Sequence, residues 1–235
     1  RERAKALYDK IRQSGLYDDK LGMYITSESL AEESLEIGRA RAFVPGWLER
    51  ESCFMHMEYK YLLGLLKTGL YDQFFQDIKT AFPPFMDPAV YGRSILENSS
   101  FIASTRNPDR SEHGRGFVAR LTGTTAELIT MWLYMMTGMK LFTVKGGELC
   151  FRLNPLLPSD FFDEKNEVRF TLFSDTKVIY RNPLRKATYG EEAAIIISYT
   201  LTYQNGPSES VEVVSGRLAE DLRQGLIDQI VVQLG

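Results

Sequence analysis

Apolar residues recur every three or four positions through the first 140 residues, which is the spacing of a helix with one buried face. The run 52–68 shows this pattern best, because Phe54, Met57 and Tyr61 fall on one face. A single glycine, Gly69, links this run to the next, so the two helices are expected to form an antiparallel hairpin. The same spacing predicts helices at 2–14, at 28–40, at 70–82, and from 124 to a glycine at 138.

After residue 140 apolar and polar residues alternate, which predicts half-buried strands. Helices followed by strands indicate an α+β fold. We therefore expect a helical domain over 1–140 and a small antiparallel C-terminal β-sheet domain over 141–235. The alternation predicts strands at 149–153, 168–172, 177–180, 194–203, 210–214 and 227–234, with a short helix at 217–224.

A glycine-rich loop leads directly into the helix that ends at Gly138. Thr124 and Glu127 have the spacing of a capping box, in which each side chain accepts a hydrogen bond from a backbone N–H of the first turn. The start of a helix gathers unpaired N–H groups and the positive end of its dipole. Thr122 and Gly123 therefore lie where an anion would bind, and the alternative is a capped helix without a ligand.

Two further polar residues lie near the start of the helix at 52–68. His56 is off the apolar face and beside Lys60, so its imidazole either contacts solvent or faces a polar pocket. Glu49 follows Trp47 and either accepts hydrogen bonds from hydroxyl groups or stabilises the helix dipole. The pattern alone leaves both choices open.

Composition excludes several classes of function. A net charge of −3 and a pI of about 5.6 give no electrostatic reason to expect nucleic acid or a membrane as a partner. Cys53 and Cys150 lack the spacing of a metal site, so we expect reduced, buried thiols, no metal and a cytoplasmic location. The chain also lacks a Walker loop and a dinucleotide-binding fingerprint. It opens in a helical pattern without methionine, as a piece of a longer protein would.

Four segments of the chain resemble one known family. Residues 47–56 read Trp-Leu-Glu-Arg-Glu-Ser-Cys-Phe-Met-His, 87–91 read Asp-Pro-Ala-Val-Tyr, and 121–126 read Leu-Thr-Gly-Thr-Thr-Ala. With Leu-Asn-Pro-Leu-Leu-Pro-Ser-Asp at 153–160, they resemble segments of glycoside hydrolase family 94, the inverting β-glucoside phosphorylases, in order and approximate spacing. Two more segments, at 36–43 and 97–101, are most similar to the 1,2-β-oligoglucan (sophoro-oligosaccharide) phosphorylases of that family.

The resemblance implies that the chain is the last part of an (α/α)6 barrel followed by the family's C-terminal β domain. It implies phosphorolysis with inversion, in which phosphate attacks the anomeric carbon of a β-linked gluco-oligosaccharide and gives α-glucose 1-phosphate. Inorganic phosphate is then a substrate, and no cofactor is expected. The protein partners it implies are the remainder of the barrel and, in a homodimer, a second copy.

The family's motifs match individual residues of this chain. The resemblance implies that His56, Thr122 and Gly123 bind phosphate and that Glu49 binds the acceptor sugar. Trp47 stands beside Glu49, and we expect it to stack against a sugar face because of that position.

The chain also departs from the family's pattern. The family's catalytic aspartate has no match here and is expected before Arg1, as is a phosphate-contacting arginine unless Arg115 or Arg120 replaces it. Glu127 stands where the family often has an aromatic residue. We therefore expect this segment to be inactive alone. The alternatives are a hydrolase on the same barrel, which releases glucose without phosphate, and a non-catalytic carbohydrate-binding or structural fragment.

Overall fold

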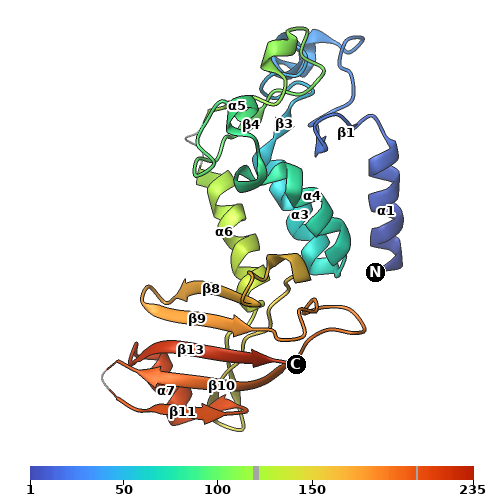
Figure 1. The fold of residues 1–235 in the computed structure, drawn as a ribbon. Helices are drawn as coiled ribbons and strands as arrows, with labels where there is room; N and C mark the ends of the chain where they lie inside the picture. The colour runs from blue at the N-terminus through green and yellow to red at the C-terminus, as the bar shows by residue number, and fades with distance from the viewer. Residues whose placement is uncertain (119–121, 205) are drawn as a thin grey trace. The chain divides into compact units, whose positions relative to one another are not determined.

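The computed structural model describes residues 1–118, 122–204 and 206–235 and shows a mixed α+β chain (Figure 1). The chain forms two compact units, Arg1–Met131 and Trp132–Gly235. Helices dominate the first unit and β-sheets the second, so the α+β class predicted from the change in hydrophobic period is confirmed. The described helices do not close into a barrel.

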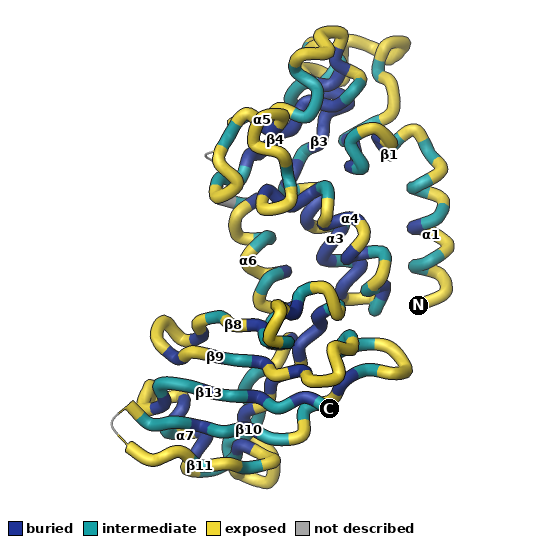
Figure 2. Tube along the Cα trace, viewed as in Figure 1, coloured by how far each residue is buried: buried dark blue, intermediate teal, exposed yellow. Residues whose placement is uncertain are grey.

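The predicted hairpin of helices is present in the first unit as α3 (Met55–Thr68) and α4 (Tyr71–Ala81). Gly69 ends α3 in the left-handed conformation, with a φ of 76°. The predicted apolar face is wrong at Met57, which is 59% exposed, whereas Glu58 beside it is buried. Figure 2 shows the buried positions along both helices, which include Met55, Tyr59, Leu62, Leu66, Phe74 and Ile78.

A buried carboxylate, Asp77 of α4, connects α1 (Glu2–Gln13) to the hairpin. It accepts hydrogen bonds from the hydroxyl groups of Tyr8 at 3.2 Å and Tyr24 at 2.7 Å, and from Nη1 of Arg12 at 3.1 Å. Because a buried charge is costly unless it is paired and hydrogen-bonded, this cluster stabilises one arrangement of the helices. Tyr24 belongs to β2 (Met23–Tyr24), which pairs with β1 (Tyr17–Asp18).

The predicted helix at 28–40 is wrong. The structure has only the 3-10 turn η1 (Leu35–Ile37) and the single-turn helix α2 (Arg39–Ala42) in this region. Leu35 and Ile37 are exposed, so a longer helix here would have no apolar face to bury. The other short elements of the first unit are β3 (Cys53–Phe54), η2 (Pro83–Phe85), α5 (Pro88–Tyr91), β4 (Phe101–Ile102), η3 (Arg110–Glu112) and β5 (Gly116–Phe117).

The helix α6 (Thr122–Thr137) ends at Gly138, whose φ of 79° is left-handed as predicted. Its start differs from the prediction, because Thr122, Gly123 and Thr124 all lie inside the helix. Thr124 is buried and its Oγ1 has no hydrogen-bond partner among the described residues. The predicted capping box between Thr124 and Glu127 is therefore not formed.

The second unit contains a five-stranded sheet in the order β11-β10-β13-β9-β8 (Figure 1). It also contains a three-stranded sheet in the order β12-β7-β6. Each of the six predicted strands overlaps one that is present, but the expectation of an antiparallel sheet is wrong at one place, because β13 pairs with β9 in parallel. The bounds are β6 (Phe142–Lys145), β7 (Glu148–Phe151), η4 (Ser159–Phe161), β8 (Glu167–Leu172), β9 (Thr176–Arg181), β10 (Ile196–Tyr203), β11 (Ser208–Val211), β12 (Val214–Ser215), α7 (Arg217–Arg223) and β13 (Ile227–Leu234).

Both cysteines are free thiols; Cys53 is buried, whereas Cys150 is half-buried rather than buried as expected. None of the described helices combines the length and apolar character that crossing a membrane requires.

Candidate functional site

The imidazole of His56 lies directly against Gly123, although the two residues are far apart in the sequence. His56 is in the first turn of α3 and Gly123 in the first turn of α6. A Cβ atom placed on Gly123 would lie 2.8 Å from both Cε1 and Nδ1 of His56, which is too close for a real side chain. Glycine at 123 is therefore what permits this approach. The structure thus brings together two of the residues predicted to bind phosphate.

The start of α6 has the features of an anion-binding site. The N–H groups of a first helical turn have no partner within the helix, and the helix dipole is positive there. The side chain of His56 is 34% exposed, so its ring can donate a hydrogen bond to a ligand from solvent. An anion bound here would accept hydrogen bonds from the imidazole and from backbone amides together, as phosphate does at helix N-termini.

Glu127 of α6 lies beside the imidazole of His56. Its Oε1 is 3.8 Å from Nε2 of His56. Helical side chains lean toward the N-terminus, so a residue one turn after Gly123 covers the surface above that glycine. A carboxylate in this position attracts a protonated imidazole and repels an incoming phosphate. An anion must therefore compete with Glu127 for His56.

Aromatic residues of the short sheet β3-β4-β5 contact both His56 and Trp47. Phe54 of β3 lies edge-on to His56, with 6.3 Å between ring centroids, and stacks on Phe101 at 4.5 Å. Phe101 is paired across β4 and β5 with Phe117, whose ring centroid is 4.0 Å from that of Trp47. The short sheet β3-β4-β5 therefore positions both predicted site residues.

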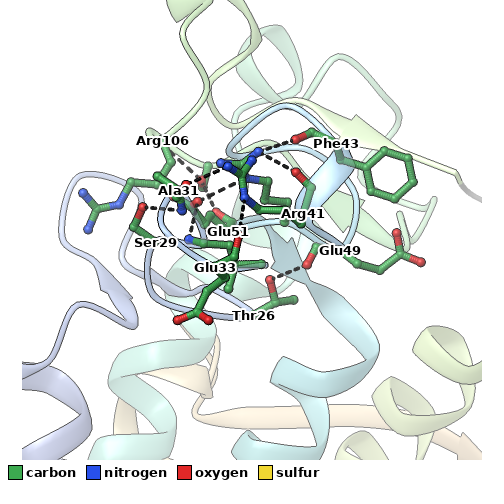
Figure 3. Close-up of polar contacts among 12 residues, drawn as sticks. Thr26, Ser29, Ala31, Glu33, Arg41, Phe43, Glu49, Glu51 and Arg106 are labelled. Carbon is green, nitrogen blue, oxygen red and sulfur yellow. Dashed lines mark hydrogen bonds and ion pairs between the residues drawn. The ribbon is translucent and has the colours of Figure 1, made fainter. Parts of the chain in front are cut away.

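The loop before β3 is held in place by a buried guanidinium group. Nη1 of Arg50 donates hydrogen bonds to the carbonyl oxygens of Arg41 at 2.8 Å and Phe43 at 2.9 Å (Figure 3). Nε of the same residue lies 3.3 Å from the carboxylate of Glu51, which is also buried. Glu51 therefore orders the loop and does not offer its carboxylate to a ligand.

Glu49, the predicted sugar-binding residue, points its carboxylate away from that network (Figure 3). Its Oε1 lies 2.8 Å from Nη2 of Arg39, whose side chain is 77% exposed. Exposed ion pairs contribute little to stability, so Glu49 can exchange Arg39 for a sugar hydroxyl at small cost. Among the described residues, no hydrogen bond or ion pair joins Glu49 to His56 or Gly123.

Backbone strain occurs in the two segments that flank these residues. Among the described residues of the first unit, those other than glycine with a positive φ are Leu48 at 48°, Glu51 at 56° and Val118 at 54°. Positive φ is costly for side chains with a Cβ, most of all for a β-branched residue such as Val118. Strain of this kind is more frequent at functional sites than elsewhere.

Sequence reasoning missed one polar feature of α3. Glu58 is buried, and neither of its carboxyl oxygens has a hydrogen-bond partner among the described residues; the same holds for the hydroxyl of Tyr61. Both residues line a cavity of about 170 Å³. Burial, assisted by the charge of Asp77, raises the pKa of Glu58 to about 8, so the carboxyl is protonated at neutral pH. Its position three residues after Met55 and four before Leu62 is the signal that could have shown it on the buried face.

Some predicted positions lie outside the described residues. Arg120 and Leu121 are among them, and so is the side chain of Thr122. Arg115 lies 3.4 Å from Glu112, from Nη1 to Oε1, and its role in phosphate binding stays a prediction. Among the described side chains, no group of three or more His, Cys, Asp or Glu residues could hold a metal ion.

A comparison of the chain with models of known protein families and with curated protein sequences finds no match.

Proposed function

We propose that the chain is the C-terminal part of an inverting β-glucan phosphorylase, which transfers a glucosyl unit from a β-linked oligosaccharide to inorganic phosphate and gives α-glucose 1-phosphate. The observation that carries the proposal is the packing of His56 against Gly123 at the start of α6. These are two of the residues that the resemblance to glycoside hydrolase family 94 assigns to phosphate. In this proposal the helices of the first unit belong to the last part of an (α/α)6 barrel.

The chemistry of such a reaction suits the groups that are present. Phosphate is already an anionic nucleophile, so the second carboxylate that a hydrolase uses to activate water is not needed. The site needs donors that hold phosphate, which His56 and the amides of α6 would supply. Glu49 would accept hydrogen bonds from acceptor hydroxyls, and Trp47 would stack on the sugar ring. A general acid for the leaving oxygen would come from a residue outside 1–235.

The test uses the fact that the chain has only two histidines. We expect inorganic phosphate to shift the imidazole NMR signals of His56 in a saturable way, while chloride at equal ionic strength does not. His113 is an internal control, because its Nε2 already has a partner in the carbonyl oxygen of Asn107, at 2.8 Å. His56 signals that do not move at the highest soluble phosphate concentration would overturn the proposal.

Two substitutions make the test specific for this geometry. Gly123→Ala places a Cβ against the imidazole, so we expect phosphate affinity to fall about tenfold, which corresponds to ~1.4 kcal/mol. Gly64→Ala in α3 is the matched control, because the space around Gly64 is open. Glu127→Gln removes the competing charge and should raise phosphate affinity by roughly threefold or more. Wild-type phosphate affinity in both site variants would contradict the assignment.

An assay of glucose release and a measurement of oligosaccharide binding separate the alternatives. Release of glucose from a β-gluco-oligosaccharide in phosphate-free buffer would indicate a hydrolase. Binding of the oligosaccharide with no response of His56 to phosphate would indicate a carbohydrate-binding or structural fragment. Either result would overturn the phosphorylase proposal.

A further inference from the structure

A groove in the second unit is lined by polar and apolar residues of the small sheet β12-β7-β6 and of the segments beside it. Its volume of about 660 Å³ is in the range of sites that hold small molecules. Thr143 of β6 and Cys150 of β7 are directly paired, so their side chains share the face that lines the groove. Lys145 lies two residues after Thr143 and is on that face too, while residues 194–196 at the start of β10 also line it.

Three cationic side chains line this groove without a partner. Lys140, Lys145 and Arg152 are exposed, and none of their side chains has an ion pair or hydrogen bond among the described residues. Glu212 is the one carboxylate among the described lining residues. Acidic residues outnumber basic ones over the whole unit, so the groove is not part of a generally basic surface. By contrast, several other arginines of the unit are paired with carboxylates: Arg169, Arg181 and Arg217.

We propose that this groove binds a small organic phosphate that carries hydroxyl groups, such as a phosphate ester of a sugar. A phosphate dianion is best held by several cations, and the planar guanidinium of Arg152 can donate to two of its oxygens at once. Lys140 and Lys145 would add point charges that neutralise the remaining oxygen. This site does not depend on the function proposed for His56 and Gly123.

The rest of the lining favours an ester over the bare ion. The side chains of Thr143 and Asn154 line the groove and have no hydrogen-bond partner among the described residues, so both are available to hydroxyl groups. Glu212 can accept hydrogen bonds from the same hydroxyls. The groove is also much larger than a phosphate ion. We therefore expect a sugar phosphate to bind more tightly than either inorganic phosphate or the unmodified sugar.

Cys150 provides a reporter inside the groove. It is half-buried and lines the site, whereas Cys53 is 0% exposed and burial raises the pKa of its thiol. In the folded chain, iodoacetamide should therefore alkylate Cys150 and spare Cys53. We expect glucose 6-phosphate to slow alkylation of Cys150 severalfold in a saturable way, and glucose at the same concentration to have no effect. The modified residue is identified by mass spectrometry of the digested protein.

Substitution of the cations tests whether protection comes from this groove. Lys145→Ala and Arg152→Ala should each raise the concentration of glucose 6-phosphate needed for half-protection about tenfold, because each removes a charge-assisted hydrogen bond to the phosphate. Lys165→Ala is the matched control, because Lys165 is an exposed cation of the same unit that does not line the groove. His56→Ala should leave the protection unchanged.

Each other outcome would overturn the proposal. Unchanged alkylation at all concentrations of glucose 6-phosphate would show that the groove does not bind it. Equal protection by inorganic phosphate would show an anion site without recognition of the ester. Protection that survives Lys145→Ala and Arg152→Ala, or that disappears in His56→Ala, would place the ligand elsewhere.

Discussion

At the scale of single residues, Glu58 is a buried acid whose charged form is unfavourable in the folded chain. Its carboxyl group is buried beside a cavity and lacks a hydrogen-bond partner among the described residues. Burial of the charged form is unfavourable, so the folded chain keeps this group protonated to about pH 8. In the unfolded chain the same group ionises near its ordinary value of 4.5.

This difference predicts how stability depends on pH. Between these two pKa values the folded chain binds a proton that the unfolded chain has lost, so the free energy of unfolding falls as pH rises, by up to ~1.4 kcal/mol per pH unit. Glu58→Gln removes the ionisation. We expect urea unfolding at several pH values from about 5 to about 8 to show a smaller decline for the variant than for the wild type.

The comparison with the variant isolates Glu58, because all other titrating groups are the same in both chains. Curves of stability against pH that run parallel for the two proteins would show that the carboxyl is not buried in this way.

Sequence reasoning identified the candidate site residues but not their contacts. The match of motifs singled out His56 and Gly123, whereas no spacing along the chain could show that the ring of one lies on the backbone of the other. The predicted apolar face of α3 included Met57 and left out Glu58, although the spacing of Glu58 from Met55 and Leu62 places it on the buried face. The polarity of the two side chains favours burial of Met57 and exposure of Glu58, which is the reverse of what the structure shows.

At the scale of elements, the period of the hydrophobic pattern predicted most of the longer helices and strands that bury one face. Six strands of the second unit were predicted to within a few residues, with 227–234 matching β13, whereas β6 was not predicted. The stretch 28–40 has helical spacing but no core to pack against, so it forms short turns. The parallel pairing of β13 with β9 depends on contacts across the sheet, which a strand's own pattern does not contain.

The two glycines of the α3 region should respond to substitution in opposite directions. Gly69 has a φ of 76°, so Gly69→Ala should lower the free energy of unfolding by about 1–2 kcal/mol through strain in the left-handed conformation. Gly64 lies within the helix with open space around it, so Gly64→Ala should raise that free energy by about 0.5–1 kcal/mol. Urea unfolding of both variants provides the measurement, and a change of the same sign in both would contradict this account.

At the scale of the whole chain, binding and turnover should be separable. The donors that would hold phosphate lie within 1–235, while the resemblance matches none of its residues to the general acid. We expect the purified chain to bind phosphate at His56 and to release no α-glucose 1-phosphate from β-1,2-, β-1,3- or β-1,4-linked gluco-oligosaccharides. Loss of a general acid typically costs a factor of about 10²–10⁴ in rate.

That assay has a clear contrary result. Phosphate-dependent release of α-glucose 1-phosphate by the chain alone would mean that a carboxyl group within 1–235 donates the proton. The first residues to substitute would then be Glu49 and Glu127.

The order of strands in the five-stranded sheet has a consequence for synthesis on the ribosome. The central strand, β13, is the last of the five in the sequence, and both of its neighbours, β9 and β10, are made earlier (Figure 1). Until residues 227–234 leave the exit tunnel, the two halves of the sheet have no strand to join them. Until then the nascent unit exposes unpaired strand edges, with which other chains can pair. A ribosome that stalls shortly before residue 227 would therefore leave a product prone to aggregation.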